Sequence, residues 1–379
     1  MIPSQRPLFD IPDDVAYFNC AYMGPFLKTV RAAGHMGIDR KSLPWMVSPA
    51  DFFSESEKAR SLFATLVGAR PDDIAIVSSA SYGLATAAKN IPFERGQKIL
   101  LLEDQFPSNV YCWRELARRK GGKILTVKTP ADQDWTAAIL SAIDKDVAIA
   151  ALPHNHWTDG ALIDLVAIAD ALRKQGAKLV LDVTQSLGAN PLDLAAVKPD
   201  FMVAAAYKWL LGPYSVGFMY IAPEYHDGEP LEYNWLNREG SEDFAGLVDY
   251  ADGYQAGARR FDMGERANFA LMPAAIAALE QILDWGVLEI QQTLTAKTRE
   301  IADRTAEFGF TSLPESFRAG HFLGLRCTGG LPADLPAKLT AENIHISVRG
   351  SSMRITPHLF NNDADTDKLV TALKKHIRG

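Results

Sequence analysis

The sequence of 379 residues contains few cysteines and no long apolar run. Its three cysteines, Cys20, Cys112 and Cys327, are scattered, without Cys-x-x-Cys or metal-ligand spacing. A disulfide framework or a structural zinc site therefore has little support, and packing is the expected role of the thiols. No segment reaches the roughly 18 consecutive apolar residues of a membrane helix, and residues 1–7 lack the apolar core of a signal peptide. We therefore expect no membrane partner and a cytoplasmic location.

The chain also has no excess of positively charged residues. The chain carries 39 Lys and Arg against 46 Asp and Glu, which gives a net charge of -7. Such a chain has no basic field for nucleic acid, although a local pocket for an anionic cofactor is compatible with it. There is no internal repeat, low-complexity tract or basic helix-turn-helix segment, so no nucleic-acid partner is expected. The 47% of hydrophobic residues can build the core of two or three structural units.

Apolar segments that predict strands alternate with helical segments through the first two thirds of the chain. The predicted strands are 74–78, 98–102, 123–127, 147–152, 178–181, 201–205 and 216–221. This order predicts an α/β fold with a mostly parallel seven-stranded sheet and helices on both faces. The less regular segment 223–260 is too long for a simple connection, and we expect it to fold over the site or onto a partner subunit.

The pattern changes after residue 268. Helices are predicted at 274–283 and 287–308, short strands near 321–326 and within 344–355, and a last helix at 363–377. These elements predict a smaller α+β domain. We place the large α/β domain at residues 20–265 and the small domain at 266–379, joined by the N-terminal segment 1–19.

Two of the predicted strands end at residues that carry chemistry. The run 178–181 is followed by Asp182, and the run 201–206 is followed by Tyr207 and Lys208. Ligands bind outside the carboxyl ends of strands in open α/β sheets, so Asp182 and Lys208 should share one rim. Taken alone, Asp182 also fits a turn cap and Lys208 a surface lysine. As a pair they fit pyridoxal 5'-phosphate (PLP), which needs an acid at its pyridine nitrogen and a lysine at its aldehyde.

These residues carry a resemblance that covers nearly the whole chain. Asp182-x-x-Gln185, followed by Lys208 in a Tyr-Lys-Trp-Leu-x-Gly-Pro context, resembles the class V aminotransferase family of fold-type I PLP enzymes. That family includes kynureninases, cysteine desulfurases and isopenicillin N epimerase. The resemblance implies the fold of a fold-type I PLP-dependent transferase, PLP as cofactor, and Lys208 and Asp182 as catalytic residues.

A serine-rich turn at 78–81 precedes a predicted helix and offers backbone N–H groups and hydroxyls at the helix N-terminus. A simple helix cap would have the same sequence. The resemblance assigns the two phosphate-contacting positions to Ala80 and Ser81, and Tyr207 is a further phosphate donor. The serine that the family usually has three residues before the lysine is Ala205 here, so another donor must replace it.

Three further residues are expected at the cofactor ring. Phe106 lies in a Phe-Pro-Ser-Asn segment that resembles kynureninases, and the resemblance implies that it stacks on the pyridine, although a loop phenylalanine is more often part of the core. By resemblance His156 and Gln185 reach the cofactor hydroxyl. His154 and His156 lack a third ligand, so a metal site is not expected.

The C-terminal region should hold the substrate. Arg354 resembles the arginine that binds the α-carboxylate, a role that suits a planar guanidinium, and Arg349 is a weaker second candidate. A structural ion pair is the alternative for Arg354. The segment 264–268 takes the place of a Gly-Thr-Pro-Asn segment that crosses the dimer interface to the neighbour's phosphate, but Glu265 replaces the threonine. A homodimer is still implied.

The reaction itself is less well defined. A desulfurase needs a mobile thiol in the small domain; the segment 349–353 has none, and Cys327 lies at the end of a predicted strand. We therefore expect an aminotransferase acting on the α-amino group of an amino acid. A kynureninase-like hydrolase or a Cβ lyase of the desulfurase or selenocysteine lyase type is the second hypothesis. An epimerase or a PLP-binding module without turnover comes after these.

Overall fold

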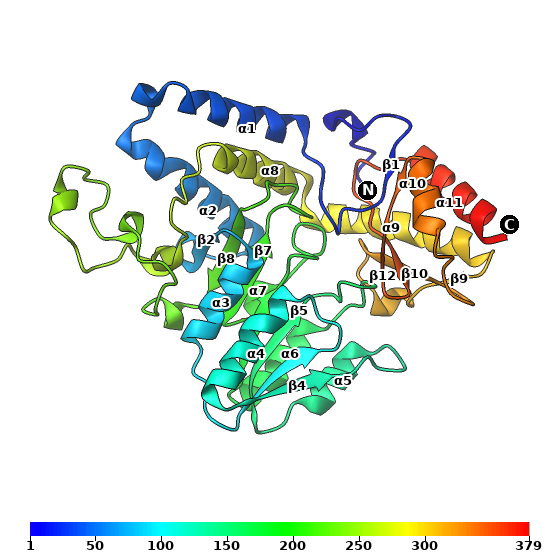
Figure 1. Cartoon of the computed structure of the whole chain (residues 1–379), viewed down its shortest axis with the longest axis horizontal. Coiled ribbons are helices and arrows are strands. Elements are labelled where there is room, and N and C mark those ends of the chain that lie inside the picture. The colour runs from blue at the N-terminus through cyan, green and yellow to red at the C-terminus, as the bar shows by residue number, and fades with distance from the viewer. Residues whose placement is uncertain (379) are drawn as a thin grey trace.

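The computed structural model describes residues 1–378, and its centre is a seven-stranded sheet (Figure 1). The strand order is β2-β8-β7-β6-β5-β3-β4. Only β8 is antiparallel to its neighbours, β2 and β7, so the sheet is mostly parallel as predicted. The strands are β2 (Ile74–Val77), β3 (Lys98–Leu102), β4 (Lys123–Val127), β5 (Val147–Pro153), β6 (Lys178–Asp182), β7 (Phe201–Ala205) and β8 (Gly217–Ile221).

Helices cover both faces of this sheet because its central strands are apolar on both sides. On one face pack α3 (Ala80–Asn90) and α4 (Ser108–Lys120), through Leu84, Trp113 and Leu116 among others. The opposite face is covered by α2 (Ser54–Val67), α5 (Trp135–Ala142), α6 (Leu165–Lys174), α7 (Leu194–Val197) and α8 (Leu271–Trp285). The large sheet is therefore a three-layer unit, with its strand ends free to carry the site.

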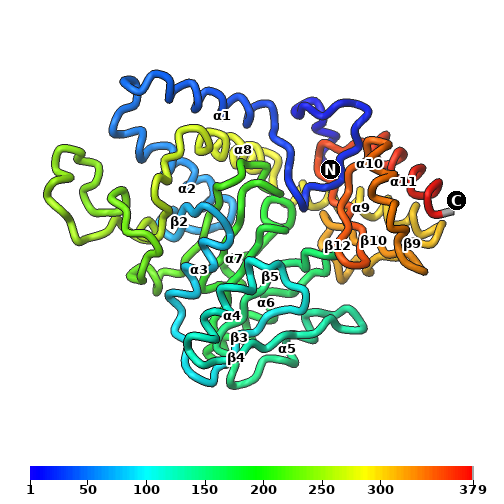
Figure 2. Tube along the Cα trace, viewed as in Figure 1, coloured from blue at the N-terminus to red at the C-terminus, as the bar shows by residue number. Residues whose placement is uncertain are grey.

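A second group of elements lies beside this unit (Figure 2). An antiparallel sheet has the order β12-β13-β10-β9, and the parallel pair β1 and β11 lies next to it. Their bounds are β1 (Ala16–Tyr17), β9 (Phe310–Thr311), β10 (Leu323–Cys327), β11 (Ile344–His345), β12 (Ser347–Arg349) and β13 (Ser352–Ile355). The helices are α9 (Val287–Ala306), α10 (Leu335–Ala341) and α11 (Asp363–Arg378).

The N-terminal segment joins these C-terminal elements. β1 pairs in parallel with β11, and Arg6 Nη1 lies 2.8 Å from Asp365 Oδ2 of α11. The helix α1 (Lys28–Lys41) then runs back along α8, as Figure 1 shows. The division into domains at 20–265 and 266–379 remains a prediction.

The less regular segment after β8 consists of short 3-10 turns, η5 (Pro223–Tyr225), η6 (Trp235–Asn237), η7 (Gly246–Val248) and η8 (Gly257–Phe261). In Figures 1 and 2 it projects to the side of the molecule, away from α9 and α11. None of its residues lines the cavity at Lys208. The expectation that it folds over the site of its own chain is therefore wrong, and contact with a partner subunit remains a prediction.

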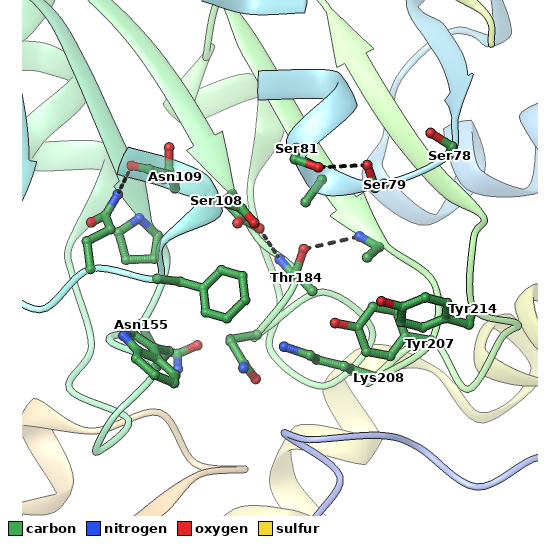
Figure 3. Close-up of a pocket in the computed structure, with 18 of the residues that line it drawn as sticks. Ser78, Ser79, Ser81, Ser108, Asn109, Asn155, Thr184, Tyr207, Lys208 and Tyr214 are labelled. Carbon is green, nitrogen blue, oxygen red and sulfur yellow. Dashed lines mark hydrogen bonds between the residues drawn. The ribbon is translucent and has the colours of Figure 1, made fainter. Parts of the chain in front are cut away.

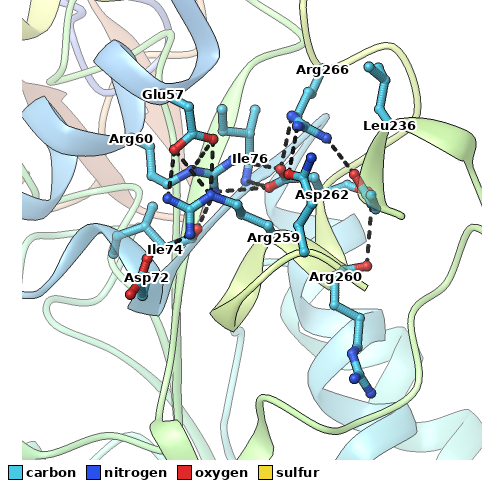
Figure 4. Close-up of polar contacts among 12 residues, drawn as sticks. Glu57, Arg60, Asp72, Ile74, Ile76, Leu236, Arg259, Arg260, Asp262 and Arg266 are labelled. Carbon is cyan, nitrogen blue, oxygen red and sulfur yellow. Dashed lines mark hydrogen bonds and ion pairs between the residues drawn. The ribbon is translucent and has the colours of Figure 1, made fainter. Parts of the chain in front are cut away.

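A buried ion cluster fixes the chain where this segment returns to the large sheet (Figure 4). Asp262 is fully buried between Arg60, whose Nη2 lies 2.6 Å from Oδ2, and Arg266, whose Nε lies 3.2 Å from Oδ2. Asp262 also accepts a hydrogen bond from the backbone of Ile76 in β2. Because a buried carboxylate needs such partners, the cluster ties residues 259–266 to α2 and β2.

Within residues 1–378, no single helix is both long enough and apolar enough to span a bilayer. The pair α8 and α9, which is bent by 75° at its junction, meets the length and composition requirement only when the two helices are taken together.

Candidate active site

The carboxyl ends of four parallel strands open into a cavity of about 380 Å³. Turns after β3, β5, β6 and β7 line it, together with the turn between β2 and α3 and the residues before β8. All eight cofactor residues expected from the sequence lie in its wall: Ala80, Ser81, Phe106, His156, Asp182, Gln185, Tyr207 and Lys208. Figure 3 shows Lys208, Tyr207 and Tyr214 pointing into the middle of this space.

Lys208 and Asp182 are both buried in the cavity wall, with Lys208 only 5% exposed. Burial lowers the pKa of Lys208 to about 8; the charge of Asp182 opposes this effect, and that of Arg354 adds to it. Burial raises the pKa of Asp182; hydrogen bonds from the Thr184 side chain and from the Thr184 backbone N–H, the latter at 3.0 Å, oppose this effect. The register places Asp182 opposite Val203 of β7, two residues before that strand ends. A lysine with a lowered pKa facing a buried acid is typical of a functional site.

The first turn of α3 forms one end of the cavity. The Ser79 hydroxyl caps the helix by accepting a hydrogen bond from Tyr82 N at 3.1 Å, and it lies 2.9 Å from the Ser81 hydroxyl (Figure 3). The backbone N–H groups of Ala80 and Ser81 have no acceptor in the described part of the chain. Free N–H groups at the positive end of a helix of 11 residues suit a phosphate.

Further hydroxyl groups surround this end and offer a replacement for the serine missing at Ala205. Thr184 Oγ1 accepts a hydrogen bond from Ala205 N at 3.1 Å, and the Thr184 hydroxyl also hydrogen-bonds to the carboxylate of Asp182, where it lowers the pKa. The rings of Tyr207 and Tyr214 lie together, with centroids 4.7 Å apart, and both line the cavity. The donor set therefore fits the phosphate of PLP.

The imidazole of His156 bonds to the protein through both nitrogens. Its Nε2 lies 3.0 Å from the carbonyl oxygen of Glu103, its Nδ1 lies 2.7 Å from the Thr158 hydroxyl, and the ring stacks on Trp135. The neighbouring Asn155 is completely buried, its amide oxygen has no donor among the described residues, and its Nδ2 makes one contact of 3.5 Å. A cofactor contact by His156 remains a prediction, but Asn155 offers a freer polar group.

Gln185 and Phe106 also line this cavity. Gln185 Nε2 donates to the carbonyl of Ala21 at 3.1 Å, and Oε1 accepts from Trp209 at 3.2 Å, which leaves one N–H free. The centre of the Phe106 ring lies 5.3 Å from Lys208 Nζ, so the ring is part of the site and not of the core. Stacking on the cofactor remains a prediction for Phe106.

A second cavity of about 330 Å³ adjoins the first and shares Phe106, Trp157, Gln185, Tyr207, Lys208 and Tyr214 with it. Arg349 and Arg354 line only this second cavity. Arg354 is 2% exposed and forms no ion pair within the described residues, so the structure disfavours the alternative of a structural ion pair. Burial lowers its pKa to about 9, and the charge of Arg349 contributes.

Glu265 lies outside both of these cavities. It is exposed, has a left-handed backbone with φ of 56°, and borders a different hollow beside α1. The adjacent Arg266 does not neutralise Glu265, because Arg266 is bound to Asp262 and Asn237. None of the three cysteines lines the cavities at Lys208.

The sequence reasoning missed Asn155, Thr184 and Tyr214. Thr184 and Asn155 each lie within two residues of a strand end, and that position was the available signal. Tyr214 precedes β8, and its neighbour Ser215 has a positive φ of 66° that no pattern of apolar residues reveals. Such backbone conformations often occur at functional sites.

Comparison with known proteins agrees with this geometry. Residues 46–363 match the family model described as Aminotransferase class-V. An uncharacterised aminotransferase of Bacillus subtilis (strain 168) is 27% identical over 322 residues, which are 81% of this chain and 80% of the relative. Isopenicillin N epimerase of Streptomyces clavuligerus is 25% identical over 334 residues, 83% of each chain. Kynureninase of Deinococcus radiodurans is 27% identical over 292 residues, 74% of this chain and 67% of the relative.

Solved structures share the fold. A complex of a cystine C-S lyase with its product cysteine persulfide has a TM-score of 0.85 at 18% identity and covers 96% of this chain and 98% of its own. A cysteine desulfurase from Thermococcus onnurineus NA1 has a TM-score of 0.81 at 19% identity, covering 100% and 99%. The matched residues 46–363 span most of the chain and include every residue that lines the first cavity. This protein belongs to the class V aminotransferase family of PLP-dependent enzymes.

Proposed function

We propose that this protein is an aminotransferase, which removes the α-amino group of an amino acid and passes it to a 2-oxo acid. One observation carries the proposal: a lysine with a lowered pKa faces a buried acid in one cavity, and a buried arginine without a carboxylate partner lies in the adjoining one. This arrangement suits a substrate whose α-amino group lies at Lys208 and whose α-carboxylate lies at Arg354.

Each of these side chains then has a defined task. Lys208 Nζ holds the cofactor and, once released, takes the proton from the substrate Cα; a pKa near 8 leaves about a tenth of the amine neutral at pH 7, far more than the ordinary pKa of a lysine would. Asp182 keeps the pyridine nitrogen protonated. Bound PLP supplies an electron sink for the negative charge that develops at Cα. Arg354 orients the substrate so that the Cα–H bond points the right way.

The residues that would contact the phosphate, the ring and the hydroxyl of PLP can also be assigned. We propose that Ala80 and Ser81 bind the phosphate with backbone N–H groups, with Tyr207 and Tyr214 adding hydroxyl donors. Phe106 stacks on the pyridine, and the cofactor hydroxyl is bound by Gln185 with Asn155 or His156. We also propose a homodimer with a cytoplasmic location.

A Cβ lyase or a kynureninase-like hydrolase is the alternative, and the absence of a cysteine from both cavities argues against the desulfurase type. The test follows the visible spectrum of the PLP-loaded protein while single amino acids are added without a 2-oxo acid. An aminotransferase loses the absorbance of bound PLP permanently and releases a 2-oxo acid.

The competing reactions change the absorbance of bound PLP in a different way and release different products. Absorbance that returns while ammonia, alanine or a cleaved side chain accumulates would identify a lyase or hydrolase. Lys208→Ala serves as the control, and we expect it to abolish turnover. Wild-type turnover by that variant would contradict the assignment of Lys208.

A further inference from the structure

The hairpin of β12 and β13 contributes Arg349 and Arg354 to the wall of the second cavity. Arg354 pairs with Ser347, and Arg349 pairs with Ser352. Side chains alternate along a strand, so these four residues share a face, with the two arginines as diagonal neighbours. The guanidinium carbons of Arg349 and Arg354 each lie 5.8 Å from the centre of the Trp157 ring. They are therefore separated by no more than twice that distance.

Arg354 has donors left for one carboxylate. Its Nε and Nη2 both donate to the Ser347 hydroxyl, at 2.8 and 2.6 Å, and Nη1 donates to the carbonyl of Trp157 at 3.1 Å. A guanidinium has five N–H donors, so two remain, one on each terminal nitrogen. Such a pair binds the two oxygens of one carboxylate side by side. A single α-carboxylate thus satisfies Arg354 completely.

Arg349 is a second cation without an anion. Its one hydrogen bond to the protein runs from Nη1 to the carbonyl of the adjacent Val348, at 2.8 Å, and no carboxylate pairs with it in the described part of the chain. By contrast, Arg326 on the neighbouring strand β10 is paired with Asp159 at 2.7 Å. The charge of Arg349 also lowers the pKa of both Lys208 and Arg354.

The two connected cavities therefore contain more positive than negative side chains. Lys208, Arg349 and Arg354 line them, whereas Asp182 is the only carboxylate in their walls. Asp182 lines only the first cavity, where the pyridine nitrogen is expected. Cations placed together at a partly closed site attract an anion and stabilise it more strongly than they would in water.

We infer that the site selects amino acids whose side chain ends in a second carboxylate. Arg354 binds the α-carboxylate. Arg349, its diagonal neighbour on the same face of the hairpin, binds the side-chain carboxylate. The inference rests on the proposed function, because it takes the amino acid to be bound at Lys208 and Arg354. Arg349 is thus a specificity residue, because the two free donors of Arg354 already bind both oxygens of the α-carboxylate.

The first measurement is binding without turnover. The PLP-loaded wild-type protein is titrated with glutarate and succinate, which have two carboxylates and no amine, and with butyrate, which has one; the absorbance of bound PLP reports binding. We expect the dicarboxylates to bind at least about tenfold more tightly, since a charged pair at Arg349 is gained. Arg349→Met should abolish this difference and leave the affinity for butyrate unchanged.

The second measurement compares substrates. We expect kcat/KM for glutamate or aspartate to exceed that for the isosteric glutamine or asparagine by about 100-fold, and Arg349→Met to remove that preference mainly through KM. Arg299→Met is the matched control, because Arg299 pairs with Glu315 on the surface and lines neither cavity. It should leave the preference intact.

The outcomes separate this inference from the proposed function. If the protein binds glutarate tightly through Arg349 but transaminates no amino acid, the proposed function is wrong. The inference of a binding site for two carboxylates is then supported. Transamination of neutral amino acids as fast as acidic ones, or an unchanged preference in Arg349→Met, would overturn the inference. Either of these two results would be expected if a carboxylate of a partner subunit neutralises Arg349.

Discussion

Lys208 experiences opposing electrostatic effects that can be separated by substitution. Burial lowers its pKa to about 8, the negative charge of Asp182 raises the pKa, and the positive charge of Arg354 lowers it. The neutral amine is the form that attacks an aldehyde, so the fraction available for cofactor capture rises as the pH passes through the pKa.

We predict that the rate at which the cofactor-free protein captures pyridoxal rises with pH, with a midpoint near 8. Asp182→Asn removes an effect that raises the pKa, so its midpoint should move to lower pH. Arg354→Met removes an effect that lowers the pKa, so its midpoint should move to higher pH. Stopped-flow absorbance between pH 6 and pH 10 measures the three midpoints. Pyridoxal is used because it has no phosphate that would titrate as well.

The opposite directions make the result decisive. If both variants shift the midpoint in the same direction, burial and not the two charges controls Lys208. Arg299→Met serves again as a control, since its exposed pair with Glu315 should leave the midpoint unchanged.

At the level of elements, the strands of the large sheet were predictable to within one residue at each end. Their apolar runs are short and bounded by polar residues, and all except the edge strand β4 are buried on both faces, so this pattern is typical of the strands of a parallel sheet. The helices α1 and α2 were not predicted. α1 buries only Val30 and Gly37, so its sequence shows little of the apolar periodicity that identifies a helix.

The same reasoning explains which parts of the site were found. Asp182 is the last residue of β6 and Lys208 follows the end of the neighbouring strand β7 by three residues, so topology alone brings them together. The partners of His156 come from residues 103 and 135, distant in the sequence, and the packing that orients its ring is invisible to local pattern. The freer position of Asn155 is a consequence of that packing.

The crossing of α1 over the start of α8 depends on a glycine. A Cβ on Gly37 would overlap the carbonyl oxygen of Phe269, whereas a Cβ on Gly34 would lie 3.6 Å from the carbonyl oxygen of Ala270, an ordinary contact. We predict that Gly37→Ala destabilises the protein by about 1–3 kcal/mol, because the packed backbone must shift. Gly34→Ala should stabilise it by up to about 1 kcal/mol through helix propensity.

The melting midpoints of the two variants, followed by circular dichroism at one protein concentration, test this prediction. Because both substitutions add the same methyl group to the same helix, equal shifts would show that the close approach at Gly37 is not limiting.

At the scale of the whole molecule, the surface formed by the C-terminal half of α1 and the turn after it carries exposed apolar side chains, next to the segment that resembles a dimer-crossing loop. Met36, Ile38, Trp45 and Met46, on α1 and the turn that follows it, are 67%, 55%, 76% and 67% exposed. Ile38 borders a hollow of about 690 Å³ that Glu265 and Asn268 also line. A large exposed apolar patch usually marks an interface. We therefore expect a second copy of the chain to cover this face.

We predict that the protein sediments at about twice the 41.6 kDa of one chain. The double variant Ile38→Asp and Trp45→Asp should sediment as a monomer, since two charges would be buried without partners. It should also bind PLP more weakly than wild type if the segment 264–268 reaches the neighbouring site.

Leu288→Asp, at an exposed apolar residue of α9, is the control and should remain dimeric. Circular dichroism checks that the double variant folds. A wild-type protein that sediments as a single chain at micromolar concentration would show that the site is complete within one subunit, and the exposed face would then need another explanation.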